Sequence, residues 1–308
     1  MSAMDIETPD LCVVGTLAFD DIETPSGVRE GILGGSATYF SVAASHFAKV
    51  GVVGVVGEDF PAEFRRVLEG HDVGLAGLEV DPKGKTFHWK GKYEGDMDQA
   101  QTLATDLNVL ETFAPKLPEA YQASPYVFLA NTDPAIQMSV LDQLSDPRLV
   151  VMDTMNLWID IARDNLLKVL KRVDGLMIND AEAKALSGED NLIAAGRALV
   201  DFGPRFVVVK KGEHGSFLFS DSRLFALPSY PLDTVVDPTG AGDSFAGGVM
   251  GYLAGSNAQR VNDVCRSMLY GTVVASFTVS DFSLDCLSTL ERAQVDERAD
   301  EMRGFIRV

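Results

Sequence analysis

The stretch Asp237-Pro-Thr-Gly-Ala-Gly-Asp-Ser-Phe-Ala-Gly-Gly248 combines a proline turn, a loop of small residues and the start of an apolar helical run. Small residues that open a helix leave backbone N–H groups unpaired at the positive end of the helix dipole. This predicts an anion-binding loop at Gly240, Ala241 and Gly242. Asp243 follows on the first helical turn, where an acid also has a purely structural explanation as a complement to the dipole. An anion loop beside a proton acceptor is, however, the pair of groups that phosphoryl transfer to a hydroxyl requires.

Two other nucleotide-binding motifs do not fit the sequence. A dinucleotide fingerprint G-x-G-x-x-G starting at Gly240 would need glycine at position 245, where Phe245 stands, and would follow the first strand. The triplet Gly84-Lys85-Thr86 lacks the first glycine of a P-loop, because Glu79 occupies that position. We therefore expect neither a nicotinamide dehydrogenase nor a P-loop enzyme.

Upstream of this stretch, short β-branched runs alternate with amphipathic segments. Buried strands are expected over residues 11–16, 50–56, 126–130, 149–153, 175–178 and 206–210. Helices are expected over residues 36–48, 136–144 and 161–173. The alternation predicts an α/β fold with a mostly parallel sheet, helices on both faces, and a ligand site beyond the carboxyl ends of the strands.

Two segments, 17–33 and 84–95, break the alternation. The first is rich in Asp, Thr, Gly and Pro, and the second alternates its side chains in the period of a strand. We expect a small β lid inserted in the N-terminal half of one domain that spans residues 1–308, with ordinary surface hairpins as the alternative. Segment 283–303 has the pattern of a solvated terminal helix. No linker divides the chain, so we expect one domain rather than the two that 308 residues would allow.

The composition excludes several classes of protein. Lys and Arg number 26 against 45 Asp and Glu, a net charge of −19 that repels polyanions, so nucleic acid is not an expected partner. No apolar run approaches the roughly 18–20 residues that cross a bilayer, so no membrane association is expected. The acidic N-terminus lacks the pattern of a secretory signal. Cys12, Cys265 and Cys286 are widely spaced and odd in number, which favours reduced thiols and a cytoplasmic location.

Four motifs in order resemble the ribokinase-like (PfkB) carbohydrate kinases, a family that includes nucleoside kinases. Residues 237–250 match the family's C-terminal signature, and Gly34-Gly35 matches its N-terminal diglycine. Asn179-Asp-Ala-Glu182 is similar to the N-x-x-E element of the family, and Lys210-Lys-Gly-Glu-His-Gly215 resembles the strand and turn that border the nucleotide. The resemblance covers nearly the whole chain and implies the ribokinase-like fold and an ATP-dependent kinase.

The resemblance also implies roles around the phosphates. Asp243 would be the catalytic base, with the loop 240–242 directing N–H groups at the transferring phosphoryl. Asn179 and Glu182 would order the phosphates and Mg²⁺, Glu182 acting through water because Mg²⁺ keeps several of its waters. The alternative for Asn179 is a helix cap.

Three residues of the strand and turn motif would border ATP: Lys210, Gly212 and Gly215. An exposed lysine and a hairpin turn are the alternative interpretations. Asp237 and Thr239 match the position at which the family often holds a monovalent cation, which makes K⁺ a further expected ion.

For the acceptor, Asp20 matches the carboxylate that grips substrate hydroxyls, although neighbouring Asp21 leaves the choice open by one residue. Gly34 and Gly35 would allow the backbone to approach a polyol closely. The position that carries Asn in ribokinases falls at Tyr39 here, which puts ribose in doubt.

Aromatic residues are a second departure from the sugar-kinase pattern. Tyr39, with Phe19, Phe87 and Trp89 of the expected lid, could stack on a nucleobase, and packing within the lid is the alternative. Asn131, after the strand at 126–130, is a further expected substrate contact.

Three functions compete on these residues. A sugar kinase ranks slightly ahead of a nucleoside kinase of the same family. A non-catalytic ATP- or ligand-binding protein is the remote third, because the anion loop and Asp243 are intact. The resemblance further implies a homodimer through the lid.

Overall fold

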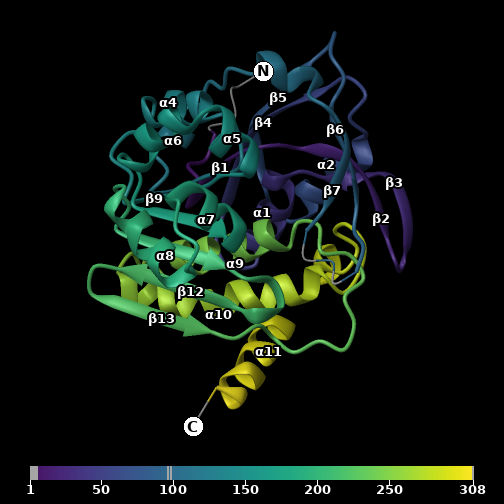
Figure 1. The fold of residues 1–308 in the computed structure, drawn as a ribbon. Helices are drawn as coiled ribbons and strands as arrows, with labels where there is room; N and C mark the ends of the chain where they lie inside the picture. The colour runs from purple at the N-terminus through teal and green to yellow at the C-terminus, as the bar shows by residue number, and fades with distance from the viewer. Residues whose placement is uncertain (1–5, 96, 98, 307–308) are drawn as a thin grey trace.

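The computed structural model describes residues 6–95, 97 and 99–306. A nine-stranded sheet with the order β13-β12-β11-β10-β9-β8-β1-β4-β5 forms its centre (Figure 1). The strands from β11 to β5 are parallel: β1 (Leu11–Val14), β4 (Val50–Gly57), β5 (Gly74–Asp81), β8 (Tyr126–Leu129), β9 (Leu149–Asp153), β10 (Gly175–Asn179) and β11 (Phe206–Lys210). All six strands expected from the sequence are present. The antiparallel hairpin of β12 (Ser216–Ser220) and β13 (Arg223–Leu227), and β5 at the other edge, were not expected.

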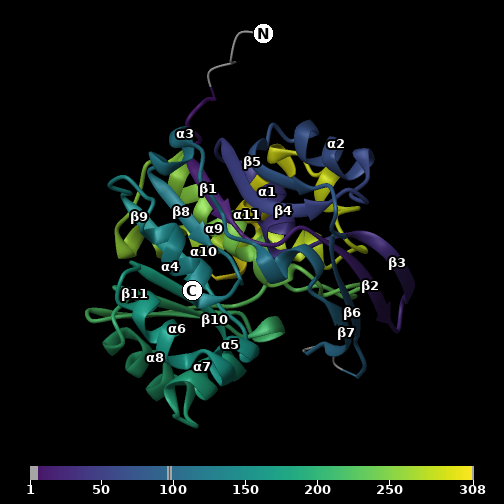
Figure 2. The same cartoon turned by 90° about the horizontal axis from the view of Figure 1, so that it is seen from above.

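Helices cover both faces of this sheet, as the alternating pattern predicts (Figure 1 and Figure 2). One buried cluster joins the sheet to α1 (Ser36–Ser45), α2 (Ala62–Gly70), α9 (Ala241–Gly255), α10 (Val261–Thr278) and α11 (Arg292–Phe305). A second cluster, on the other face, includes α3 (Glu119–Gln122), α4 (Pro134–Leu141), α5 (Asn156–Ile161), α6 (Arg163–Leu170), α7 (Asp180–Ser187) and α8 (Leu192–Asp201). The ribokinase-like α/β architecture predicted from the sequence is confirmed.

Helix α9 packs closely on its neighbours because small residues line its sides. A Cβ built on Gly247 would lie 2.4 Å from the Phe40 carbonyl oxygen of α1, and one on Gly251 would lie 2.8 Å from the Ala44 carbonyl oxygen. Most side chains of α9 are buried. The helix is therefore a rigid support for the loop at its N-terminus.

A second sheet of four strands projects from the N-terminal half, at the right of Figure 1. Its order is β3-β2-β6-β7, with β2 (Ala18–Thr24), β3 (Gly27–Gly34), β6 (Phe87–Lys92) and β7 (Gln101–Asp106). The sequence predicted segments 17–33 and 84–95 as parts of this sheet. Strand β7 was missed because all six of its residues are exposed and carry no alternating pattern.

Two expected helices differ from the observed ones. The helix expected over 161–173 is present as α6 but is shorter, because Ala162 leaves helical geometry (φ −132°, ψ 25°) between the end of α5 at Ile161 and the start of α6 at Arg163. The break lets α5 bury Ile159 and α6 bury Leu166 separately. The helix over 283–303 begins only at Arg292; the preceding residues form turns and a short 3₁₀ helix, Leu287–Thr289.

Within the described part of the chain, none of the helices combines the length and the apolar character needed to span a membrane.

Candidate active site

The loop predicted to bind anions lies at the start of α9. Gly240 is the N-cap of the helix in the left-handed conformation (φ 73°), which favours glycine. A Cβ at Gly240 would lie only 2.3 Å from the ring of Tyr39, so this ring packs directly against the loop. Tyr39 is 1% exposed, and its hydroxyl has no hydrogen-bond partner among the described residues. The Tyr39 ring therefore supports the loop, and a substrate contact by this residue stays a prediction.

Asp243 follows on the first turn of α9, where the sequence placed the catalytic base. The pKa of Asp243 is raised to about 7, because burial and the negative charge of Asp153 raise it more than the Lys210 ammonium lowers it. A carboxylate with a pKa near neutrality suits proton transfer better than an ordinary aspartate, whose conjugate acid is too strong. The position and the pKa both fit a general base.

Lys210 ends β11 and reaches Asp153 at the end of β9, with 3.3 Å between Nζ and Oδ2. A Cβ at Gly242 would lie 3.0 Å from the same Nζ, so the ammonium also faces the anion loop. The alternative of an exposed lysine is therefore excluded for Lys210. Sequence reasoning missed Asp153, although an acid that ends a parallel strand faces the edge where ligands bind.

Asn179 and Glu182 form a capping box at the start of α7. The Glu182 N–H donates to Asn179 Oδ1 (2.8 Å), and the Asn179 N–H donates to Glu182 Oε2 (3.0 Å). The cap interpretation is thus correct, and it also fixes the Glu182 carboxylate above the end of β10. Glu182 is 7% exposed, and its pKa is raised by burial and by the charge of Asp153. A buried oxygen ligand that is held in place this way fits a water-mediated Mg²⁺ site.

Gly212 begins a short 3₁₀ turn, Gly212–His214, between β11 and β12, and Gly215 follows it. A Cβ at Gly215 would lie 2.1 Å from the Leu227 carbonyl oxygen, so the turn is packed against the end of β13. The Lys211 ammonium lies 3.9 Å from the centre of the Phe217 ring. The turn lies next to Lys210, at the edge where the sequence predicts the nucleotide.

The choice between Asp20 and Asp21 follows from the alternation of β2. Asp20 is 3% exposed, and it lies on the face of β2 that carries the other buried residues of the strand. Burial raises the pKa of Asp20 to about 8, with further contributions from the charges of Asp237 and Asp243. Asp21 lies on the other face, where it accepts the Gly31 N–H (2.7 Å) and contacts His88 (3.1 Å). Asp20 is therefore the aspartate that lies with the site.

The diglycine leads from β3 into α1 and passes close to Asp20. A Cβ at Gly34 would overlap the Asp20 carboxyl at 1.9 Å, and the Gly35 N–H donates to that carboxyl. Gly35 is the N-cap of α1 (φ 96°), and a Cβ there would lie 2.5 Å from the Thr16 carbonyl oxygen. The two glycines therefore let the Asp20 carboxylate lie directly against the turn that leads into α1.

Asp237 ties the anion loop to segment 279–285. Its Oδ1 accepts the Thr239 N–H (2.9 Å) and its Oδ2 accepts the Ser283 N–H (3.2 Å). The Thr239 hydroxyl donates to the Tyr93 hydroxyl of the small sheet (3.2 Å). The Ser283 hydroxyl donates to the Leu33 carbonyl (2.6 Å), which fastens the same segment to β3. These four contacts connect the small sheet with the loop that precedes α9.

The aromatic residues divide between the two faces of the small sheet. Phe19 packs against Phe60 and Phe64 of the main domain, with ring centres 6.4 and 5.8 Å away, so it is packing and not an open platform. Trp89 is paired with Asp20 in the parallel strands β2 and β6, so the two side chains lie on the same face of the small sheet. We call this face, which carries the buried residues of β2, the inner face. Its indole lies over Gly91, where a Cβ would be 2.0 Å from the ring, and it is only partly buried. Phe87, two residues before Trp89, is also half-buried.

Asn131 follows β8, but its side-chain amide contacts other protein groups. Its Oδ1 accepts the Trp158 Nε1–H (2.9 Å), and its Nδ2 lies 3.1 Å from the Met155 sulfur. Asn131 orients α5 in this structure, so the described contacts do not join it to Asp20.

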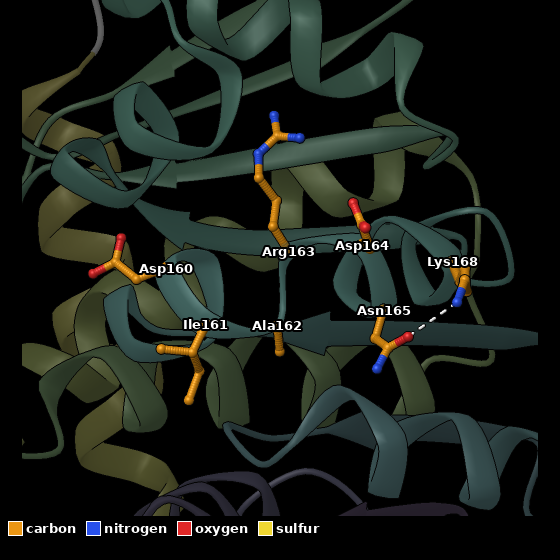
Figure 3. A pocket seen from close by; sticks show the side chains of 7 residues that line it. All are labelled: Asp160, Ile161, Ala162, Arg163, Asp164, Asn165 and Lys168. Atoms are coloured by element: carbon orange, nitrogen blue, oxygen red, sulfur yellow. Dashed lines mark hydrogen bonds between the residues drawn. The ribbon is translucent and has the colours of Figure 1, made fainter.

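A surface hollow of about 510 Å³ lies at the junction of α5 and α6, apart from these residues (Figure 3). Seven residues line it: Asp160, Ile161, Ala162, Arg163, Asp164, Asn165 and Lys168. None of the residues predicted for the site is among them. In Figure 3 the Lys168 ammonium donates to the Asn165 amide oxygen (3.0 Å), which is a contact within α6.

The chain matches known proteins over most of its length. Residues 8–289 match the family model described as pfkB family carbohydrate kinase. The chain is 32% identical over 263 residues to a cytidine kinase of Thermococcus kodakarensis, and the aligned region covers 83% of this chain and 91% of the relative. It is 26% identical over 290 residues to a nucleoside kinase of Methanothermobacter thermautotrophicus, which covers 89% and 91% of the two chains.

The fold is likewise similar to solved structures. An Escherichia coli protein solved in complex with ATP and Mg²⁺ superposes with a TM-score of 0.76 at 18% identity, covering 94% of this chain and 99% of that one. Kinases of this family use ATP and Mg²⁺ and phosphorylate sugars or nucleosides. This chain belongs to the PfkB family of carbohydrate kinases, and it is a phosphotransferase that acts on an alcohol group.

Proposed function

We propose that this protein is an ATP-dependent nucleoside kinase, with cytidine as the first nucleoside to test. The observation that carries the proposal is that the buried Asp20 carboxylate and the half-buried Asp243 on the first turn of α9 lie close enough for the charge of Asp243 to raise the pKa of Asp20. The sequence alone ranks a sugar slightly ahead of a nucleoside. Two relatives that match most of the chain are named cytidine kinase and nucleoside kinase, and these names favour the nucleoside over the sugar.

In this proposal Asp20 accepts a hydrogen bond from the acceptor, and Asp243 takes the proton of the attacking hydroxyl. The N–H groups of Gly240 and Gly242 face the transferring phosphoryl, whose charge they stabilise without reorganisation, whereas the Ala241 N–H donates to the Pro238 carbonyl (3.2 Å) and closes the turn before the helix. Gly242 leaves the space between the loop and the Lys210 ammonium free of a Cβ, which would lie 3.0 Å from Nζ, and this space fits a phosphate.

The nucleotide phosphates lie, in the same proposal, along the ends of β10 and β11. Lys210 contacts them, and the turn with Gly212 and Gly215 borders the nucleotide. Asn179 and Glu182 hold Mg²⁺ through water, and Mg²⁺ supplies neutralisation of the phosphate charge. The buried, hydrogen-bonded Glu182 supports this assignment.

Trp89 is the proposed platform for the nucleobase. It lies beside Asp20 on the inner face of the small sheet, and Gly91 leaves room for the indole to lie flat along the strand. Its Nε1–H donates to the Thr102 hydroxyl (3.3 Å), which fixes the ring orientation. A base that stacks on an aromatic ring gains about 1–3 kcal/mol, whereas a free sugar gains little.

The test is ADP release in the presence of cytidine, uridine, adenosine, ribose and fructose. We expect turnover with a nucleoside, and a roughly 10- to 100-fold loss of kcat/KM for that nucleoside in Trp89→Ala. Lys90→Ala is the matched control, because Lys90 is the next residue of β6 and pairs with Asp21 on the outer face. Turnover of ribose or fructose alone would overturn the nucleoside assignment in favour of a sugar kinase.

Fluorescence supplies a second readout for the same platform. The chain has two tryptophans, so Trp158→Phe leaves Trp89 as the sole indole. Cytidine should quench its emission in a saturable manner, and ribose should not. Equal quenching by both ligands would contradict stacking of the base on Trp89.

We further propose that a monovalent cation, K⁺, lies behind the loop at Asp237 and Thr239. Asp237 is 1% exposed, and none of the described Lys or Arg side chains pairs with its carboxylate, so a buried negative charge there would be neutralised by a cation. Replacing K⁺ by choline should lower both turnover and the melting temperature; equal values in both salts would refute the site.

A homodimer through the small sheet and a cytoplasmic location complete the proposed function. The exposed strand β7 offers an unpaired edge to a second copy, and the three described cysteines form no disulfide. Sedimentation of the protein at micromolar concentration tests the dimer: a single monomeric species would refute it.

A further inference from the structure

Asp153 and Lys210 form an ion pair that crosses the end of β10. Strand β10 separates β9 from β11 in the sheet, so the ends of these strands lie about 10 Å apart, which is two strand spacings. The long side chain of Lys210 bridges the gap and brings its Nζ to 3.3 Å from Asp153 Oδ2. The two side chains are only 17% and 7% exposed. Because charges lose hydration when buried, such a pair is stable only where other contacts hold it.

Asp153 has those contacts. Its Oδ1 accepts the Thr154 N–H at 2.6 Å, and its backbone carbonyl accepts the Gln137 Nε2–H at 3.1 Å. Gln137 is 1% exposed and also donates to the Ala130 carbonyl at the end of β8 (3.2 Å). The backbone and one carboxylate oxygen of Asp153 are thereby fixed, and the other oxygen remains for Lys210.

Lys210 is the cation of an otherwise acidic cluster. Burial opposes its charge, yet the carboxylates of Asp153, Glu182 and Asp243 raise the pKa of Lys210 overall, so the ammonium stays charged. Its Nζ lies 3.0 Å from the position of a Cβ at Gly242, which places it at the anion loop. The ammonium therefore lies between Asp153 on one side and the proposed path of the phosphates on the other.

We propose that Asp153 is a positioning residue that holds Lys210 beside the anion loop until the phosphates of the nucleotide take over the ammonium. Asp153 acts through Lys210 and does not itself touch the substrate. The inference rests on the proposed role of ATP as the phosphate donor. The effect of Asp153 on ATP binding should therefore change sign when Lys210 is removed. With Lys210 present, Asp153 positions the ammonium; without Lys210, the lone buried carboxylate repels phosphate.

A double-mutant cycle tests this change of sign. The variants are Asp153→Asn, Lys210→Met and the double variant, and the readouts are kcat and ATP affinity by calorimetry without acceptor. We expect Asp153→Asn alone to lower kcat about 10-fold, and Lys210→Met alone to weaken ATP binding about 100-fold. In the Lys210→Met background, Asp153→Asn should strengthen ATP binding about 10-fold.

The surface pair of Arg172 and Asp142 supplies the matched control. Their Nη1 and Oδ1 atoms lie 2.5 Å apart, and Asp142 is 65% exposed, so Asp142→Asn removes the same charge far from the site and should change neither readout. Asp153→Ser is the second variant at this position, because the hydroxyl of serine can accept the Thr154 N–H but carries no charge.

Three outcomes decide the proposal. If the fold losses of the two single variants in ATP affinity multiply in the double variant, Asp153 acts independently of Lys210 and the proposal is overturned. Wild-type kcat and ATP affinity in both Asp153 variants would also overturn it. Improved ATP binding in the double variant supports it. Calorimetry needs no acceptor, so failure to phosphorylate any nucleoside would refute the proposed substrate and leave this result intact.

Discussion

Replacement of Gly240 by alanine separates backbone strain from steric overlap at the anion loop. Gly240 adopts φ 73°, and a Cβ there would lie 2.3 Å from the Tyr39 ring. Gly188 adopts a similar φ of 79° at the end of α7, but a Cβ there would meet nothing within 4 Å. The pair Gly188→Ala and Gly240→Ala therefore differs in the overlap with Tyr39.

The two variants should lose different amounts of stability. Left-handed geometry costs a non-glycine residue about 1 kcal/mol, which is the whole effect expected for Gly188→Ala. In Gly240→Ala the Tyr39 ring must also shift, and overpacking adds about 1–3 kcal/mol, for a total of about 2–4 kcal/mol. Tyr39→Leu in the Gly240→Ala background should recover part of the added loss, because leucine removes the ring.

Urea unfolding gives the free energy of each variant, and ADP release gives its turnover. Gly188→Ala should keep wild-type turnover, whereas Gly240→Ala should lower it because the loop moves. If Gly240→Ala lost no more stability than Gly188→Ala, the packing of Tyr39 against the loop would be wrong.

Three further predictions concern charge. Asp243→Asn should lower kcat at least ~100-fold and leave ATP affinity nearly unchanged in calorimetry, and wild-type turnover would refute the base assignment. Because the pKa of Asp243 is raised to about 7 and the base must be deprotonated, kcat/KM should rise with pH between about 6 and 8; a flat profile there would contradict it. Burial lowers the pKa of His46 from 6.5 to about 4, so the unfolded chain binds the proton more readily than the folded protein does. The free energy of unfolding should therefore fall as the pH is lowered from about 6.5 to about 4. Urea midpoints should depend less on pH in His46→Phe than in the wild type, with His71 supplying the rest, and should be unchanged in the control His214→Phe, whose side chain is 72% exposed.

The loop and the strand ends could be predicted from the sequence because their signals are local. A turn, small residues and an acid before an apolar helix specify the start of α9 within a dozen residues. The alternation of buried runs likewise specifies which residues end parallel strands. The alternation of side chains along β2 also distinguishes Asp20 from Asp21, because only Asp20 shares the buried face with Ile22.

What the sequence did not provide depends on pairing between distant segments. The partner of Lys210 is Asp153, 57 residues away, and no local pattern joins them. Asn131 has its amide engaged by Trp158, a contact set by where α5 begins. Strand β7 forms by pairing with β6 alone, so its exposed residues show no hydrophobic period.

The contacts that join the small sheet to the anion loop link the two ends of the chain. Thr24 donates to the Val236 carbonyl across 212 residues, and Ser283 donates to the Leu33 carbonyl across 250 residues. A ribosome makes β2 and β3 early, but their partners emerge only near the end of synthesis, and contacts of such high sequence separation close slowly. During synthesis, Asp20 therefore lies in an incompletely buried sheet until nearly the whole chain has been made. A chain cut before residue 279 would retain most of the parallel sheet and lack the segment that fastens β3.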